Sequence, residues 1–96
     1  MPYALRNTAT GELLAYPQIN GYRLPYYGVR LWNETPDDAG VREALSDAGS
    51  ADLPDDWHPV ELTEHQAKMA NVKLRNDPRR RIFLQDQVLT AVSAER

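Results

Sequence analysis

Residues 12–32, "ELLAYPQINGYRLPYYGVRLW", decide the fold class that the sequence predicts. Asn20 and Gly21 both tolerate the positive φ angles of tight hairpin turns, so this pair predicts a β-hairpin with one strand on each side. Pro17 and Pro25 flank the turn and cannot donate a backbone hydrogen bond. We therefore expect both prolines at strand edges, at bulges or at positions outside the hydrogen-bonded ladder.

Apolar and polar residues also alternate outside this hairpin. Residues 2–6 alternate ahead of a turn-forming segment, residues 29–33 alternate after Gly28, and residues 57–62, "WHPVEL", form another short run. Such alternation is typical of half-buried strands. The first third of the chain is therefore predicted to form antiparallel strands, with one more strand later.

The aromatic residues near the hairpin must divide between the two faces of a sheet. Alternation places Tyr22, Leu24 and Tyr26 on one face and Arg23 and Tyr27 on the other. Because one face of a half-covered antiparallel sheet packs on a core, at least one of these rows is expected to be buried.

Two later segments have the features of helices. Residues 41–49 carry apolar residues at helical spacing and finish with Gly49, a residue that commonly ends helices. Thr63 and Gln66 match a capping box, in which the threonine hydroxyl accepts from the third helical amide while the glutamine side chain bonds back. A second helix is therefore predicted to begin at Glu64.

Residues 78–94 allow two interpretations, of which we favour another helix. Asp77 followed by Pro78 resembles a helix N-cap and first helical residue. The competing interpretation is a strand through residues 79–85, because the three consecutive apolar residues 82–84 do not respect helical periodicity. The expected helical stripe consists of Leu84, Val88, Leu89 and Val92.

Early strands followed by helices predict an α+β fold. We expect a small antiparallel sheet of three to five strands, with N-terminal hairpins, and two or three helices packed on one face. A length of 96 residues suits one core, so the expected organisation is a single α+β domain over residues 1–96.

The composition is that of an ordinary globular protein, with 42% hydrophobic and 26% charged residues. The chain has no cysteine, which excludes disulfides and thiolate metal sites and favours the cytoplasm. Residues 1–12 lack the pattern of a secretory signal, and no apolar run approaches the roughly 18 residues of a membrane helix. We expect a cytoplasmic protein that does not span a membrane.

Charge is distributed unevenly around the net value of −3. Residues 31–64 carry ten acidic residues and one arginine, whereas residues 65–81 carry six basic residues and one aspartate. Such asymmetry can mark a surface that orients a partner, and it is also common on solvated faces.

Two groups of residues are candidates for binding a partner. One combines aromatic rings and arginines on the expected open face of the sheet, and the other is a run of three arginines. Rings stack on bases and cations contact phosphates, so both groups also suit single-stranded nucleic acid. The alternative is ordinary strand composition and ion pairing with the acidic middle of the chain. The predicted partner-binding residues are Arg23, Tyr27, Arg30, Trp32, Arg79, Arg80 and Arg81.

His58, Glu61 and His65 lie close together in the sequence and raise the hypothesis of a metal-dependent hydrolase. Their spacing matches no zinc motif, and the predicted change from strand to helix separates Glu61 from His65. P-loop, dinucleotide-binding and nucleophile-elbow motifs are also missing from the sequence. We assign no catalytic residue, metal or cofactor and favour a role other than catalysis.

Residues 53–69, "LPDDWHPVELTEHQAKM", resemble the segment that leads into the helix of small phage tail-fibre assembly proteins. The resemblance covers seventeen of the 96 residues and implies a protein-binding role. We therefore expect a small protein–protein interaction domain, whose partner is another protein or a second copy of the chain. The first alternative is single-stranded nucleic-acid binding through Arg79–Arg81 and an aromatic sheet face.

Overall fold

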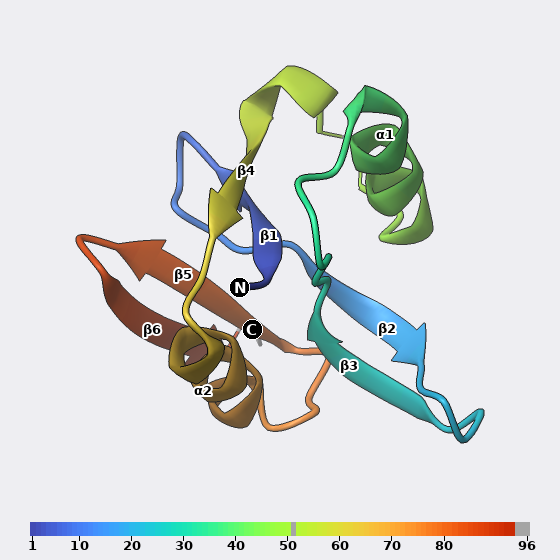
Figure 1. Cartoon of the computed structure of the whole chain (residues 1–96). Helices are drawn as coiled ribbons and strands as arrows, with labels where there is room; N and C mark the ends of the chain where they lie inside the picture. Colours follow the sequence, from blue (N-terminus) through green and yellow to red (C-terminus); the bar gives the residue numbers. More distant parts are fainter. Residues whose placement is uncertain (51, 94–96) are drawn as a thin grey trace.

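Six strands, two α-helices and one 3₁₀ helix are formed by residues 1–50 and 52–93, the part of the chain that the computed structural model describes (Figure 1). Neither α-helix in this part is long and apolar enough to cross a membrane. The elements in chain order are β1 (Tyr3–Asn7), β2 (Ala15–Ile19), β3 (Pro25–Val29), α1 (Asp38–Asp47), η1 (Pro54–Asp56), β4 (Trp57–Glu61), α2 (Glu64–Leu74), β5 (Arg80–Gln85) and β6 (Val88–Ser93).

The strands pair as three two-stranded antiparallel sheets, β1 with β4, β2 with β3, and β5 with β6. The α+β class predicted from the sequence is confirmed, whereas the prediction of one sheet is wrong. Isolated bridges connect the three pairs, including Tyr3 with Trp32 and Arg6 with Leu13. The pairs stay separate because the segment between β1 and β2 forms backbone hydrogen bonds with β1 and β5 over only a few residues.

That segment, residues 12–14, lies between β1 and β5. The Leu14 amide donates to the Leu5 carbonyl at 2.9 Å, and the Leu13 amide donates to the Ile82 carbonyl at 2.9 Å. Neighbouring residues of an extended chain point to opposite faces. As a result, Leu13 and Leu14 enter two different cores.

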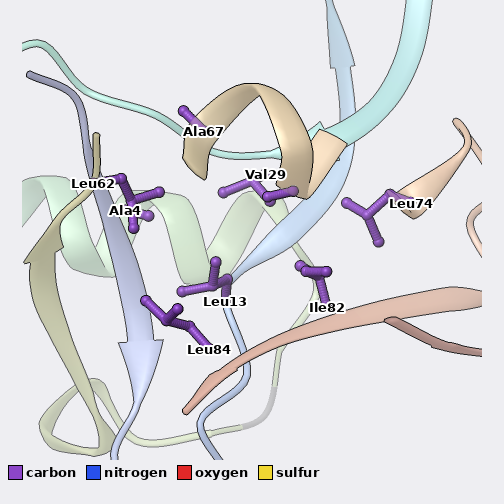
Figure 2. Close-up of a cluster of buried hydrophobic side chains, with 9 residues drawn as sticks. Ala4, Leu13, Val29, Leu62, Ala67, Leu74, Ile82 and Leu84 are labelled. Atoms are coloured by element: carbon purple, nitrogen blue, oxygen red, sulfur yellow. The ribbon is translucent and has the colours of Figure 1, made fainter. Parts of the chain in front are cut away.

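The two cores lie on opposite sides of β1 and residues 12–14, and each contains one helix. This corrects the expectation that the helices share one face: Ala4 and Leu5 alternate, so both faces of β1 are apolar and both need cover. Figure 2 shows the first core, with Leu13, Val29 and Ile82 gathered beneath α2. The first core contains Ala4, Leu13, Val29, Leu62, Ala67, Ala70, Leu74, Ile82 and Leu84. The second contains Leu5, Leu14, Tyr16, Val41, Ala44, Leu45 and Trp57.

The β2–β3 hairpin predicted around Asn20 is confirmed, with a turn of a different kind. The Arg23 amide donates to the Asn20 carbonyl at 2.9 Å, and Arg23 has a φ of 63°. A turn followed by one left-handed residue is a common three-residue hairpin loop. Tyr22 and Leu24 lie at this tip with 86% and 59% of their surface exposed, so the expected core row does not form there.

The favoured helix over residues 78–94 is wrong, and the strand interpretation is correct for the described residues up to 93. Ile82 and Leu84 are buried while Arg81 and Gln85 are exposed, which is the period of a strand. Asp86 and Gln87 have φ angles of 52° and 65°. Two consecutive positive angles define a tight two-residue hairpin turn between β5 and β6.

Both other helix predictions are confirmed. The α1 helix begins three residues earlier than the apolar pattern indicates, because the Asp37 carboxylate accepts from the Gly40 amide at 2.8 Å and caps it. The capping box of α2 forms as predicted: the Thr63 hydroxyl accepts from the Gln66 amide, and the Gln66 side chain accepts from the Thr63 amide, both at 2.9 Å.

Candidate partner-binding site

The outer edge of β3 is closed by side chains from the end of α2. The Tyr27 amide donates to Asn76 Oδ1 at 2.6 Å, and the Val29 amide donates to Asn71 Oδ1 at 2.8 Å. Pro25, the third outward residue of β3, has no amide proton. The outward donors of this strand are therefore either bonded or missing.

Prolines interrupt the outer edges of β2 and β4. The Asn20 amide donates to the Leu24 carbonyl at 3.0 Å, which sets the ladder and turns Pro17 outward at the centre of β2. The Leu62 amide donates to the Pro2 carbonyl at 2.8 Å, which in the same way turns Pro59 outward at the centre of β4. A proline at an edge prevents another strand from pairing there.

The outer edge of β5 is paired with the chain itself. The Ile82 carbonyl accepts from the Leu13 amide, and the Leu84 amide donates to the Gly11 carbonyl at 2.8 Å. The first residue of the strand, Arg80, has its amide bonded to the Asp77 carbonyl at 2.9 Å. This edge offers no position for another strand.

The outer edge of β6 is different. The two-residue turn makes Gln85 and Val88 a hydrogen-bonded pair, so Val88, Thr90 and Val92 bond to β5 while Leu89 and Ala91 direct their peptide groups outward. Within residues 1–50 and 52–93, these two outward amides have no hydrogen-bond partner. No proline interrupts the strand. The β6 edge is thus open along its centre.

A groove of about 450 Å³ runs beside this open edge, between β6 and one face of α2. Figure 1 shows α2 lying alongside the β5–β6 hairpin. The described residues that line the groove combine apolar and cationic side chains, and none of these residues is acidic: Met69, Val72, Lys73, Arg75, Arg80, Leu89, Thr90 and Ala91. We call this feature the β6 groove.

The two ends of the β6 groove differ in chemistry. The Gln66 side chain donates to the Gln87 side chain at 3.0 Å, which places the beginning of α2 beside the β5–β6 turn. Arg80 Nε donates to the Lys73 carbonyl at 2.9 Å, which places the end of α2 beside the beginning of β5. Among the residues that line the groove, the apolar Met69 and Leu89 are therefore nearer the turn end, and the cationic Lys73, Arg75 and Arg80 lie toward the opposite end.

The structure brings together some of the predicted partner-binding residues of the first third. The Arg30 guanidinium lies 4.4 Å from the centre of the Trp32 ring and donates to the Leu31 carbonyl at 2.8 Å. Tyr27 is half-buried, and its hydroxyl donates to the Arg80 carbonyl at 2.8 Å. Burial raises the pKa of this hydroxyl above its usual 10.0. Arg23 stands apart, exposed at the hairpin tip.

The three consecutive arginines point in different directions. Arg79 pairs with Asp77 at 3.2 Å, and this hydrogen-bonded pairing holds the pKa of the Asp77 carboxyl below its usual 3.8. Arg81 pairs with Glu12 at 2.9 Å. Arg80 bonds to a carbonyl and lines the β6 groove. The run therefore does not form one continuous cationic surface.

The residues of the metal hypothesis do not meet. His58 and Glu61 are three positions apart in β4, so they point to opposite faces, and His65 is exposed on the first turn of α2. In the part of the chain that is described, no group of three or more potential ligands could hold a metal ion. The geometry gives the hydrolase hypothesis no support.

Sequence reasoning missed most of the groove. Arg80 is the only predicted partner-binding residue among its lining residues. The helical interpretation places Leu89 on a helical stripe, and no binding role is predicted for Met69 or Val72. The strand interpretation of residues 79–85, continued through a turn at Asp86, was the signal that could have located the open edge.

Comparisons of the chain with protein-family models, with curated proteins and with solved structures found no match. The likeness of residues 53–69 to tail-fibre assembly proteins therefore has no support beyond that segment. The geometry of the β6 groove is the basis for the functional argument.

Proposed function

We propose that this chain acts as one protein-binding domain, which binds an extended segment of a partner protein by adding it as a strand to β6. The observation that carries the proposal is the contrast between β6 and the other edges. The edges of β2, β3 and β4 carry prolines or bonded asparagine side chains, and the edge of β5 is paired with the chain's own backbone. Within residues 1–50 and 52–93, the outward amides of Leu89 and Ala91 in β6 have no partner, and they lie beside a groove.

Strand addition suits the dimensions of this site. The outward peptide groups of Leu89 and Ala91 offer two donors and two acceptors, and each hydrogen bond contributes about 0.5–1.5 kcal/mol net. Side chains of the added strand that face α2 would enter the β6 groove and bury apolar surface against Met69 and Leu89. Backbone bonds then supply general affinity, and the groove supplies selectivity.

Single-stranded nucleic acid fits the described surfaces less well. Two of the three arginines, Arg79 and Arg81, are paired with carboxylates, and Trp32 is already covered on one side by Arg30. None of the described residues that line the β6 groove is aromatic, and stacking on aromatic rings is the usual basis of such binding. The peptide is therefore the better-supported ligand.

Among the seven predicted partner-binding residues, Arg80 is the one that the proposal uses directly. Arg23, Tyr27, Arg30, Trp32, Arg79 and Arg81 lie outside the groove and remain predictions for further contacts. They are not needed for strand addition.

The test begins with a displayed library of random eight-residue peptides selected on the immobilised protein. In the variant Ala91→Pro, the central outward donor of β6 is removed, as Pro17 and Pro59 remove it from β2 and β4. The matched control is Ala91→Ser, which keeps the donor. We expect selected peptides to bind wild type and Ala91→Ser alike and Ala91→Pro about tenfold or more weakly.

Amide hydrogen exchange, read by NMR, locates the binding. The Leu89 and Ala91 amides should exchange more slowly when peptide is bound. Should Ala91→Pro fail to fold, methylation of the peptide's own amides takes its place, and it should weaken binding at every second position only. Failure to select any peptide, equal binding to Ala91→Pro, or slowed exchange on another strand would each refute strand addition at β6.

A further inference from the structure

We infer that the segment bound at β6 is acidic in its N-terminal half and apolar in its C-terminal half. The inference rests on the proposed function and defines the class of partner. It follows from three features of the β6 groove: unpaired cations at one end, apolar side chains at the other, and the direction in which β6 runs between them.

In the part of the chain that the structure describes, the cationic end of the groove has no acidic partner. Lys73, Arg75 and Arg80 line it together, and within residues 1–50 and 52–93 none of the three forms an ion pair. This distinguishes them from Arg79 and Arg81, which both have carboxylate partners. Among the described residues, Arg79 and Arg81 outside the groove are thus ion-paired, whereas Arg75 and Arg80 inside it have no carboxylate partner.

Carboxylates are the groups that this end would bind best. Neighbouring cations repel one another, and the repulsion is relieved when an anion lies between them. Arg75 is exposed and presents a guanidinium, which binds a carboxylate through two parallel hydrogen bonds. The Arg80 Nε is already bonded to the Lys73 carbonyl, which holds that side chain in the groove.

The groove's charge argues against a second copy of the chain as the added strand. Antiparallel pairing of β6 with its own copy would set the turn end of one β6 beside the cationic end of the other, so Lys73, Arg75 and Arg80 would meet only the uncharged residues of Val88–Ser93. None of the chain's fourteen acidic residues lies in β6, and five of them lie in α1 and η1 and not in an extended segment. An acidic strand from another protein meets both requirements.

The direction of β6 sets the order of residues in the ligand. β6 begins at the apolar turn end, near Leu89, and runs toward the cationic end, opposite Arg80. Every described strand pair is antiparallel, and antiparallel pairing is slightly more stable per residue. An antiparallel ligand enters at the cationic end, so its acidic residues come first and its apolar residues follow.

Four labelled eight-residue peptides test the inference by fluorescence anisotropy. The first has three aspartates followed by valines and threonines, and the second has the same residues in reverse order. The third replaces aspartate by lysine, and the fourth replaces it by asparagine. We expect the first peptide to bind about tenfold or more tightly than each of the others, with the difference shrinking as salt is added.

A matched pair of variants connects the effect to the groove. Arg75→Glu reverses a charge inside the groove, whereas Lys68→Glu makes the same change on an exposed part of α2 that does not line it. The first peptide should bind Arg75→Glu about tenfold or more weakly and Lys68→Glu within about twofold of wild type. Equal effects of the two variants would overturn the inference, because the attraction would then be general.

The remaining outcomes separate this inference from the proposed function. If the lysine or asparagine peptide binds as well as the first, and still slows exchange at Leu89 and Ala91, the acidic preference is wrong while strand addition stands. If the reversed peptide binds best, the orientation is wrong. If no peptide binds, and an oligothymidine strand or a second copy of the chain binds instead, both proposals fail.

Discussion

The β2–β3 and β5–β6 hairpins present their outer strands to solvent in opposite ways. In the first hairpin, Pro17 closes the edge of β2, while Asn71 and Asn76 bond the outward amides of β3. In the second, β5 pairs with residues 11–13, and β6 is left without proline or a side-chain cap. The same chain therefore contains both closed and open strand edges.

In this fold, individual residues close some strand edges and leave another open. One proline interrupts the edge of β2, and two asparagines with Pro25 close the edge of β3. The open edge of β6, next to a cation-lined groove, is the feature that the proposed strand addition uses.

The largest effect is expected where one helix supports both hairpins. Leu74, at the end of α2, is fully buried in the first core together with Val29 of β3 and Ile82 of β5. Leu74→Ala should lower the free energy of unfolding by about 2–5 kcal/mol, because it leaves a cavity between the hairpins. Urea denaturation followed by circular dichroism measures the loss.

The control for this prediction is Val72→Ala, two residues earlier on the same helix. Val72 is 54% exposed, so truncating it should cost less than about 1 kcal/mol. Equal losses for the two variants would mean that α2 does not pack between the hairpins as described.

The next effect concerns the closed edge of β3. Asn71→Ala leaves the Val29 amide without its acceptor, and Val29 is buried, so unfolding should become easier by about 1–3 kcal/mol. Asn71→Asp keeps an acceptor oxygen and should retain most of the stability at neutral pH. Hydrogen exchange should speed up at Val29 in Asn71→Ala, and unchanged exchange there would contradict the assigned cap.

The β2–β3 hairpin can be predicted from the sequence, whereas the β5–β6 hairpin cannot, and the reason lies in their turns. The β2–β3 turn depends on Asn20, whose side chain accepts from the Tyr22 amide at 2.8 Å and the Leu24 amide at 3.0 Å. These bonds are local and can be predicted from residue type. The β5–β6 turn uses Asp86 and Gln87, both at positive φ, without the glycine that usually marks such a turn.

Residues 77–79 explain why a helix was favoured after Pro78. The Asp77 carboxylate accepts from the Arg79 amide at 2.9 Å, which resembles the bond of a helix N-cap. The chain then continues as strand β5 and not as a helix, because the strand buries both Ile82 and Leu84 in the first core. Local capping patterns do not indicate such long-range packing. The β6 groove also depends on packing between α2 and β6, so it could not be predicted from local sequence.

A smaller effect is expected at alkaline pH, at the junction of the two hairpins. The Tyr27 hydroxyl of β3 donates to the Arg80 carbonyl of β5, and burial raises its pKa above the usual 10.0. The folded state therefore holds this proton more tightly than the unfolded state does. The resulting stability is fully present below pH 10 and is lost as the pH rises through the folded-state pKa.

Thermal unfolding measured between pH 8 and 11 checks this direction. Tyr27→Phe should flatten the alkaline decline in part, because burial also raises the pKa of Tyr16, which still titrates in that variant. Tyr22→Phe removes a hydroxyl from the exposed hairpin tip and serves as the control. A decline that is identical in wild type and Tyr27→Phe would show that the junction hydroxyl does not contribute.

The smallest effect is expected at the ion pair that joins β5 to residues 12–14. Arg81 Nη1 lies 2.9 Å from Glu12 Oε2, and the arginine side chain is 56% exposed. Glu12→Gln should cost no more than about 1 kcal/mol, and the cost should shrink in high salt. Glu34→Gln, at an exposed acid outside any described ion pair, is the matched control in the same urea titration. A loss well above that limit would mean that β5 is held to residues 12–14 by charge. The backbone hydrogen bonds at Leu13 and Gly11, which close the β5 edge, would then contribute less stability than the ion pair.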